Sequence, residues 1–252
     1  MIIAVTNTKG GVGKTTTTVN VATGLAARNK RTLVVDLDPQ GHSTRCFISE
    51  EPDRDVSDLI MEKPSQAGRS ILPTEYENLD IVGATDRLTE TAELLQTRIR
   101  REERLVKALG HVSDQYDFII VDCPPVLGVL SYNALVAADL LIIPVQPGVG
   151  AIAGLDSLLG AAAELRDEEV EDLNYRILTT MFEIRTTRTN AMVEDLLGIH
   201  RGKLLRSIIS KSESLNQANL AGRPAVAFAS SSRGAQEYDA LCEEISRLRL
   251  QA

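Results

Sequence analysis

Short apolar segments alternate with longer segments of helical period along almost the whole chain. Six apolar segments rich in Val, Ile and Leu predict strands at 2–6, 32–36, 79–82, 118–122, 140–145 and 176–180. Segments with helical spacing predict helices at 15–28, 89–109, 152–166, 189–197, 214–221 and 232–250. This alternation is typical of βα units, so the sequence predicts an α/β fold with a mostly parallel, twisted sheet flanked by helices on both faces.

One segment interrupts the alternation. Residues 49–74 contain four Pro and Gly residues and many charges, and we expect them to form an excursion of variable structure. Both flanks continue the same strand and helix pattern, so the segment is not expected to separate two domains. The sequence therefore predicts one domain over residues 1–252.

Composition agrees with a globular domain in a reducing compartment. Of the 252 residues, 43% are hydrophobic and 25% are charged. The three cysteines, Cys46, Cys123 and Cys242, are too far apart to form a paired zinc motif, and their odd number does not suggest a disulfide framework. No leader precedes Ile2 and no apolar segment is long enough to span a bilayer, so we expect a cytoplasmic protein.

A glycine-rich segment lies between the first predicted strand and the first predicted helix. It reads Lys9-Gly10-Gly11-Val12-Gly13-Lys14-Thr15-Thr16. Glycines let successive backbone N–H groups turn toward a phosphate, and a helix start adds a positive dipole end. Lys14 is then expected to contact the terminal phosphates and the Thr15 hydroxyl to bind Mg²⁺, which predicts a nucleoside-triphosphate site.

This loop has Thr8 where the usual phosphate loop has glycine, and Lys9 directly follows. In this form it resembles the deviant Walker A motif, K-G-G-x-G-K-[TS]-[TS], of the ParA/MinD family of ATPases. Residues 34–41 are similar to the family's second strand and switch I, and residues 119–125 to its Walker B strand and switch II. Later blocks extend the resemblance, which is greatest to ParA/Soj-like members, over nearly the whole chain.

The resemblance and the requirements of phosphoryl transfer together imply roles for three carboxylates. Asp122, at the end of a predicted strand, is expected to support Mg²⁺ through water, and Asp38 to orient or deprotonate the attacking water. Asp36 is expected to orient the switch segment. The resemblance implies ATP/ADP and Mg²⁺ as cofactors and ATP hydrolysis as the reaction. The predicted catalytic residues are Lys9, Lys14 and Asp38; the metal-site residues are Thr15, Asp38 and Asp122; the nucleotide-binding residues are Lys9, Gly10, Gly11, Val12, Gly13, Lys14, Thr15, Thr16 and Asp122.

The resemblance also implies a role for Lys9 across a dimer interface. In the family, the matching lysine reaches the nucleotide of the partner subunit, in the manner of an arginine finger supplied in trans. Hydrolysis would then depend on a homodimer with ATP between its subunits. Adenine selectivity is likewise implied only by the family, because Ser210-Lys211-Ser212 stand where a proline and an asparagine usually help to form the base pocket.

Charge is unevenly distributed along the chain. The formal net charge is −8, but residues 176–233 contain nine Lys and Arg against four Asp and Glu. ParA-like proteins place contacts to DNA of any sequence in this last third, and phosphate binding of that kind needs positive charge without base recognition. The predicted DNA-binding candidates are Arg185, Arg188, Arg201, Lys203, Arg206, Lys211, Arg223 and Arg233.

The C-terminal segment distinguishes two possible functions. MinD-like members end in a basic amphipathic helix that lies on a membrane. Here Glu243 and Glu244 lie among the apolar residues of the last predicted helix, which favours packing on the core. We therefore expect an ATP-dependent homodimer that binds nucleoid DNA and positions a cargo through a ParB-like or other adaptor. The family's N-terminal helix-turn-helix extension is not expected, and the alternative is a MinD-like membrane-associated ATPase.

Overall fold

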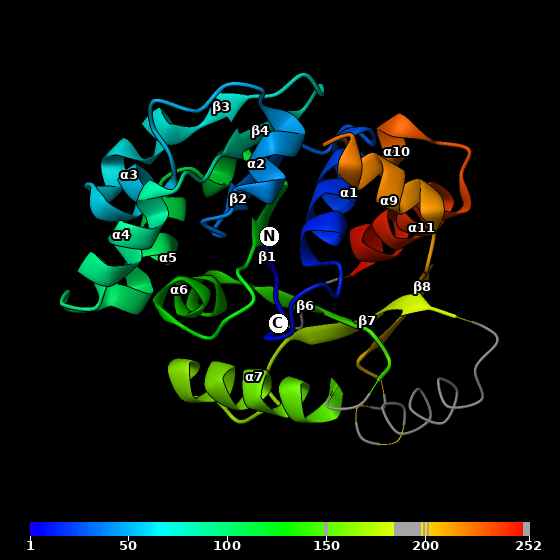
Figure 1. Cartoon of the computed structure of the whole chain (residues 1–252). Coiled ribbons are helices and arrows are strands. Elements are labelled where there is room, and N and C mark those ends of the chain that lie inside the picture. The colour runs from blue at the N-terminus through cyan, green and yellow to red at the C-terminus, as the bar shows by residue number, and fades with distance from the viewer. Residues whose placement is uncertain (149–150, 184–197, 199, 201, 249–252) are drawn as a thin grey trace.

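One twisted sheet runs through the part of the chain that the computed structural model describes, residues 1–148, 151–183, 198, 200 and 202–248. Within these residues its strand order is β3-β4-β2-β5-β1-β6-β7-β8 (Figure 1). The strands are β1 (Ile2–Val5), β2 (Thr32–Asp36), β3 (Leu72–Pro73), β4 (Leu79–Val82), β5 (Phe118–Asp122), β6 (Leu140–Val145), β7 (Tyr175–Phe182) and β8 (Leu204–Ser210). All neighbouring strands run parallel except β3 and β4. The predicted fold class is confirmed.

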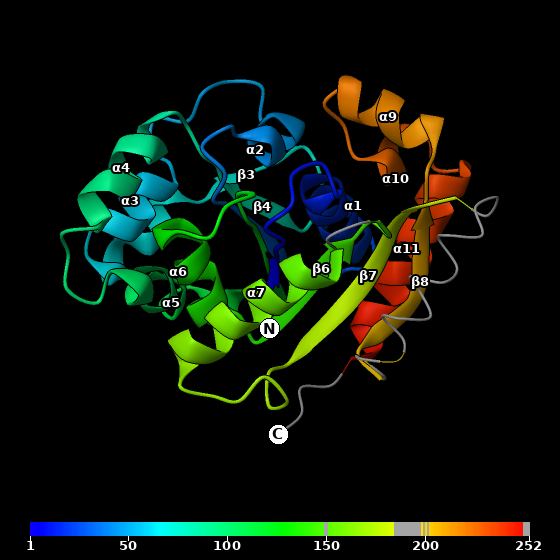
Figure 2. The same cartoon turned by 60° about the horizontal axis from the view of Figure 1, so that its bottom comes forward.

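Helices cover both faces of this sheet (Figures 1 and 2). The helices α1 (Lys14–Ala26), α9 (Glu213–Leu220), α10 (Ala225–Phe228) and α11 (Arg233–Arg247) lie on one side. The other side carries α3 (Val56–Met61), α4 (Arg87–Leu95), α5 (Arg104–Leu109), α6 (Val129–Ala137) and α7 (Ala151–Arg166). The short helix α2 (His42–Phe47) follows β2, and the 3₁₀ helices are η1 (Pro64–Ser70), η2 (Arg101–Glu103) and η3 (Ser113–Gln115).

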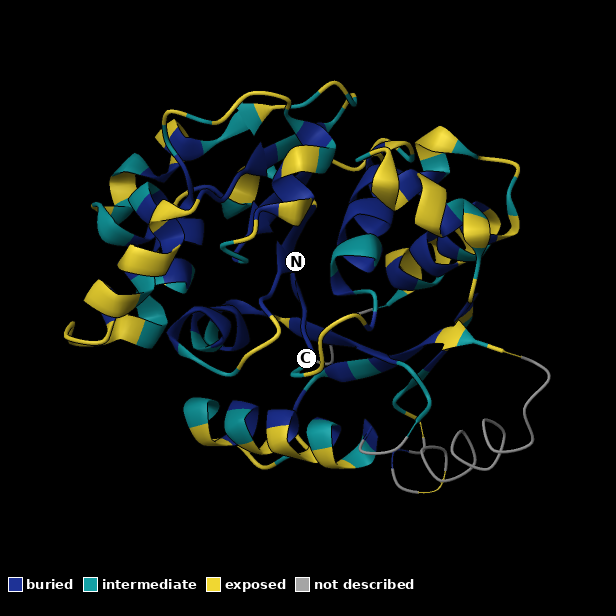
Figure 3. Cartoon of the chain, viewed as in Figure 1, coloured by how far each residue is buried: buried dark blue, intermediate teal, exposed yellow. Residues whose placement is uncertain are grey.

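The two faces of the sheet form two separate hydrophobic cores. Neighbouring residues of one strand point to opposite faces, so Val34 and Ile120 pack toward α1 and α11, whereas Val35 and Val121 pack toward α3–α7. Every residue of β5 and β6 is buried (Figure 3). Burial on both faces explains why these strands consist of continuous apolar runs without polar alternation.

The pattern of apolar residues did not predict every element. The six predicted strands are present, but β3, β8 and α6 were not predicted, nor were the short helices α2, α3 and α10. The helix predicted over 89–109 is divided into α4, η2 and α5. The helix predicted at 189–197 lies outside the described residues.

The expectation for residues 49–74 was wrong in one respect. The segment contains α3, η1 and β3, and it contributes Val56, Leu59 and Ile60 to the core. The Asp55 side chain caps α3 by accepting a hydrogen bond from Ser57 N at 2.8 Å. The segment is therefore an integral part of the fold despite its charged composition.

Helices α1 and α11 pack closely at Gly24. A Cβ atom at this position would lie 2.5 Å from Cys242 Sγ, so the buried Cys242 side chain or one of the two helices would have to shift. Gly24→Ala should therefore lower the free energy of unfolding by about 1–3 kcal/mol, as overpacking in a core does. Urea denaturation would measure this, with Gly160→Ala as the control.

Gly160 is a suitable control because it is an exposed helical glycine of α7, and a Cβ atom there would meet nothing within 4 Å. Gly160→Ala should raise stability by roughly 0.5–1 kcal/mol because alanine loses less backbone entropy on folding. Equal effects of the two substitutions would contradict the close packing of α1 on α11.

Candidate functional site

The glycine-rich segment forms an open loop between β1 and α1. Gly11 and Gly13 have φ angles of +72° and +91°, a conformation that residues with a side chain rarely adopt. A Cβ atom at either position would meet nothing within 4 Å, so the space in front of the loop is free. A hydrogen bond from Thr180 Oγ1 of β7 to Val12 O at 2.8 Å fixes the loop to the sheet.

Helix α1 begins at this loop without a side-chain cap. Its N-cap residue is Gly13, and no acidic residue lies in the first turn. The N–H groups of a first helical turn have no partner within the helix. Together with the glycine geometry, they form a cradle that suits a phosphate group.

Lys14 is buried beside the loop. Its Nζ donates to Lys9 O at 3.1 Å, and the residue is 7% exposed. Burial lowers the pKa of Lys14, while the negative charges of Asp122 and Asp38 oppose that shift. The structure therefore brings these three predicted residues together at the carboxyl ends of β2 and β5.

Asp122 and Asp36 lie side by side at the ends of two neighbouring strands. Their Cα atoms are register partners, and both side chains are fully buried. Burial raises both pKa values, and the charge of Asp122 raises that of Asp36 further. Hydrogen bonds from Ser43 and Thr15 favour the charged form of Asp122.

Asp36 holds the segment that follows β2. Its carboxylate accepts hydrogen bonds from Asp38 N at 3.0 Å, Thr44 N at 2.9 Å and Thr44 Oγ1 at 2.8 Å. Asp38 is half-buried in the intervening turn, where its Oδ1 accepts from Gln40 N at 3.0 Å. The orienting function predicted for Asp36 agrees with these contacts, and Asp38 is the more exposed of the two carboxylates.

The donor set near the loop fits Mg²⁺ bound together with a nucleotide. Within the described residues there is no group of three or more His, Cys, Asp or Glu that could hold a metal ion by itself. A hydroxyl (Thr15) and nearby carboxylates (Asp38 and Asp122) are available. Mg²⁺ commonly keeps several waters and uses one or two protein groups plus substrate phosphates, so this set is sufficient once phosphates are present.

Lys9, unlike the buried Lys14 of the same loop, has an exposed side chain. Its backbone N donates to Asn7 Oδ1 at 2.9 Å, and Asn7 Nδ2 donates to Pro144 O at 2.7 Å. The backbone of Lys9 is therefore fixed while its side chain is exposed. This geometry leaves the ammonium group accessible to a second molecule.

A small cavity lies next to the end of the glycine loop and the start of α1. It has a volume of about 120 Å³, and its lining includes Gly13, Thr16, Ser210, Asn216 and Asn219. Asn219 Nδ2 donates to Thr16 Oγ1 at 3.2 Å and so joins α9 to the start of α1. Neither asparagine was predicted, because no local pattern connects them to a loop some 200 positions earlier.

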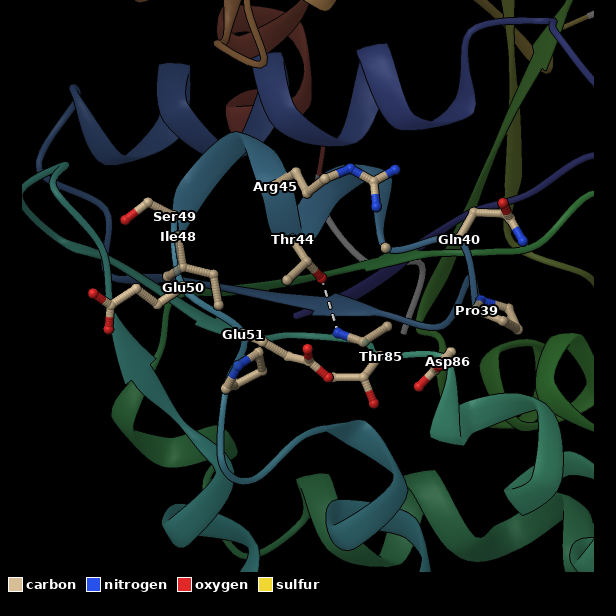
Figure 4. A pocket seen from close by; sticks show the side chains of 13 residues that line it. Pro39, Gln40, Thr44, Arg45, Ile48, Ser49, Glu50, Glu51, Thr85 and Asp86 are labelled. Carbon is tan, nitrogen blue, oxygen red and sulfur yellow. Dashed lines mark hydrogen bonds between the residues drawn. The ribbon is translucent and has the colours of Figure 1, made fainter.

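A larger cavity of about 510 Å³ lies beside the switch turn (Figure 4). Its walls are the turn at Pro39–Gly41, helix α2 with the residues after it, and the loop between β4 and α4. Thr44 Oγ1 accepts a hydrogen bond from Ala84 N at 2.8 Å across this junction. The switch turn is therefore packed against a second loop outside the nucleotide site.

The basic residues are only partly available as a DNA-binding surface. Lys203 Nζ donates to Leu173 O at 2.9 Å and lies 4.7 Å from the centre of the Tyr175 ring, which gives it a structural contact. Lys211 and Arg233 each form an ion pair, with Glu183 and Glu237. Arg206 on β8 and Arg223 between α9 and α10 are exposed. Arg185, Arg188 and Arg201 lie outside the described residues.

The apolar residues of α11 pack on the core, as predicted. Tyr238, Leu241, Cys242 and Ile245 are each at most 1% exposed and belong to the core shared with α1. Tyr238 Oη lies 3.2 Å from Thr17 Oγ1. Among the described residues, no helix has both the length and the hydropathy to cross a membrane.

Comparisons with known proteins agree with this geometry. Residues 1–175 match a family described as an AAA domain. The chain is 39% identical to the sporulation initiation inhibitor protein Soj of Bacillus subtilis, with 97% of this chain and 98% of Soj covered. It is 36% identical to the chromosome partitioning protein ParA of Myxococcus xanthus, with 98% and 88% covered. Among solved structures, cobyrinic acid a,c-diamide synthase from Mycobacterium smegmatis, with bound ATP analogue and magnesium, is similar with a TM-score of 0.80 and 28% identity, covering 98% of this chain and 94% of the synthase.

Proposed function

This chain belongs to the ParA/MinD family of P-loop ATPases, and from that premise we propose that it is an ATP-dependent dimerising ATPase that binds nucleoid DNA and positions a cargo. Its broad class is that of the partition and positioning ATPases, and its cofactors are ATP/ADP and Mg²⁺. The observation that carries the proposal is the convergence of Lys14, Thr15, Asp38 and Asp122 at an open glycine loop.

Each residue of the site has a separate role in the proposed ATP hydrolysis. The loop amides and Lys14 hold the β and γ phosphates, and Asp38 orients the attacking water or accepts its proton. Thr15 and Asp122 are the residues that would hold Mg²⁺, Thr15 through its hydroxyl and Asp122 through water. When bound, the metal neutralises charge on the phosphates. The buried position of Lys14 supports this assignment, since its charge has few partners other than the phosphates and the two carboxylates.

The exposed side chain of Lys9 supports a homodimer with ATP held between the subunits. In such a dimer Lys9 would stabilise the charge on the nucleotide of the partner subunit, so that hydrolysis requires association. An adaptor protein of the ParB type, or the adaptor of another cargo, would then accelerate hydrolysis and release the dimer from DNA. This cycle would take place in the cytoplasm, on the nucleoid.

The proposed DNA-binding surface lies on β8 and the helices α9–α11. Arg206 and Arg223 support it most directly because both are exposed, and a dimer would double their number. Lys203, Lys211 and Arg233 would contribute through their charge. The MinD-like alternative receives less support, because the apolar face of α11 is already buried against α1.

A gel shift on random-sequence duplex DNA tests the proposal, with ATP, ADP or no nucleotide at several salt concentrations. We expect retention only with ATP. If a dimer contacts about six phosphates, log K should fall with log salt at a slope of roughly −5. Removing two contacts from each subunit, with Arg206→Ala and Arg223→Ala together, should flatten the slope by roughly 3–4.

Arg98→Ala is the control, because Arg98 is exposed but follows α4 on the other side of the sheet. It should leave both affinity and slope unchanged. Absence of binding under any nucleotide, with hydrolysis intact, would refute the DNA-binding part of the proposal. Retention on anionic lipid vesicles in the same samples would favour the MinD-like alternative.

A further inference from the structure

The switch segment is fastened to the nucleotide site by a buried hydroxyl. Ser43, in the first turn of α2, donates from Oγ to Asp122 Oδ2 at 2.6 Å. Both residues are fully buried, and they lie 79 positions apart in the chain. This contact joins the segment after β2 directly to the carboxylate at the end of β5.

The two oxygens of Asp122 contact different elements. Oδ1 accepts from Thr18 Oγ1 of α1 at 3.3 Å, whereas Oδ2 accepts from Ser43 of α2. A rotation of the carboxylate would therefore strain or break a contact to at least one of these helices. The Ser43 bond is a short bond from a hydroxyl to a buried carboxylate and is therefore strong, so such a rotation is coupled to movement of α2.

Helix α2 has little freedom to absorb such a movement alone. Thr44 is bonded to Asp36 on one side and to Ala84 N on the other, as Figure 4 shows for the second contact. Packing is also close, because a Cβ atom at Gly41 would lie 3.0 Å from Ala84 O, and one at Gly83 would lie 2.9 Å from Thr44 Cγ2. A displacement of Ser43 would therefore be transmitted to the whole switch turn and to the wall of the 510 Å³ cavity.

We infer that Ser43 is a positioning residue, whose bond to Asp122 couples Mg²⁺ at the nucleotide site to the conformation of the switch segment. The inference rests on the proposed function, since it requires Asp122 to face the metal. Ser43 touches neither phosphate nor water in this scheme. Its bond would set the position of the Asp38 turn relative to the Asp122 carboxylate when Mg²⁺ is held there.

Ser43→Ala tests the inference through ATP affinity measured with Mg²⁺ and with EDTA. The alanine variant should bind ATP like the wild type in EDTA, while the gain in affinity from Mg²⁺ falls by about tenfold, as expected for one hydrogen bond to a charged group. Hydrogen exchange supplies a second readout. Mg²⁺ with ATP should protect the amides of residues 42–47 in the wild type, and Ser43→Ala should lose this protection.

Thr85→Val is the matched control. It also removes a buried hydroxyl that donates to a buried carboxylate, but the carboxylate is that of Asp55 and not that of Asp122. The control should keep both the Mg²⁺ effect on affinity and the protection of residues 42–47. Thr18→Val removes a different hydroxyl from Asp122, while the Thr15 hydroxyl is retained, and it should weaken the Mg²⁺ effect while keeping the protection.

Several outcomes would overturn the inference. An unchanged Mg²⁺ effect in Ser43→Ala would do so, as would an equal loss in Thr85→Val. If Ser43→Ala does not fold, the wild type still tests the inference. Mg²⁺-dependent ATP binding without added protection of residues 42–47 would refute the coupling of Mg²⁺ to the switch segment and leave the proposed function standing. ATP binding that does not respond to Mg²⁺ in the wild type would instead refute the proposed function.

Discussion

Replacing Asp38 by alanine should lower the rate of ATP hydrolysis by about 10²- to 10⁴-fold, the usual contribution of a positioned general base. ATP affinity should change little, because the loop amides and Lys14 do not depend on the Asp38 side chain. The turn itself should persist, since Asp38 N and Gly41 N keep their hydrogen bonds to Asp36 Oδ1 and Asp38 O. Single-turnover hydrolysis and equilibrium binding of ATP would measure the two effects separately.

Two further variants make the Asp38 prediction specific. Asp38→Asn retains an oxygen that can accept from Gln40 N but loses the charge, and it should be nearly as slow as the alanine variant. Asp86→Ala removes an exposed carboxylate on the opposite wall of the neighbouring cavity and should retain full activity. A loss of less than threefold in Asp38→Ala, or an equal loss of ATP affinity, would exclude Asp38 as the base.

The nucleotide site could be predicted largely because its parts are local in the sequence. Parallel strands covered on both faces consist of apolar runs, and Asp36 and Asp122 end two such runs at the same edge of the sheet. The glycine loop follows another strand and starts a helix. Each signal lies within about ten residues, and the parallel sheet brings the segments together without further information.

Helix α6 could not be predicted from periodicity because both sides of it are buried. Val129, Leu130, Ala134 and Leu135 are all in the core, so the helix lacks a polar stripe. Asn133 is also buried, where its side chain bonds Leu105 N and Val129 O. A run of this kind does not distinguish a helix from a strand.

Strand β8 was not predicted because the residues that stabilise it lie far from it in the sequence. It is an edge strand of the described sheet, and its register with β7 shifts between Leu204 and Ile208. The N–H groups of Arg206 and Ser207 at this irregularity are both accepted by the Glu244 carboxylate of α11, at 2.8 and 2.9 Å. Nothing near the strand in sequence indicates this contact, and the same limit applies to the Ser43–Asp122 bond.

Lys9→Ala should lower the hydrolysis rate of the assembled dimer by about 10³- to 10⁵-fold, the range known for fingers supplied in trans. ATP binding by single subunits should persist, because Lys14 remains and is held by the backbone oxygen of residue 9, which the substitution keeps. Steady-state hydrolysis at high protein concentration would measure the loss. Lys30→Ala, at another exposed lysine, should have no effect.

Mixing two inactive variants distinguishes a residue that acts across the interface from one that acts within its own subunit. In a heterodimer of Lys9→Ala and Lys14→Ala, the subunit that lacks Lys9 keeps its own Lys14 and faces the intact Lys9 of its partner. One complete site is thereby restored, so the mixture should hydrolyse ATP although neither variant does so alone. If Lys9 instead acted within its own subunit, both sites of the heterodimer would be incomplete. A tagged subunit would verify that heterodimers form. A mixture that contains heterodimers but is as inactive as its components would refute the role in trans.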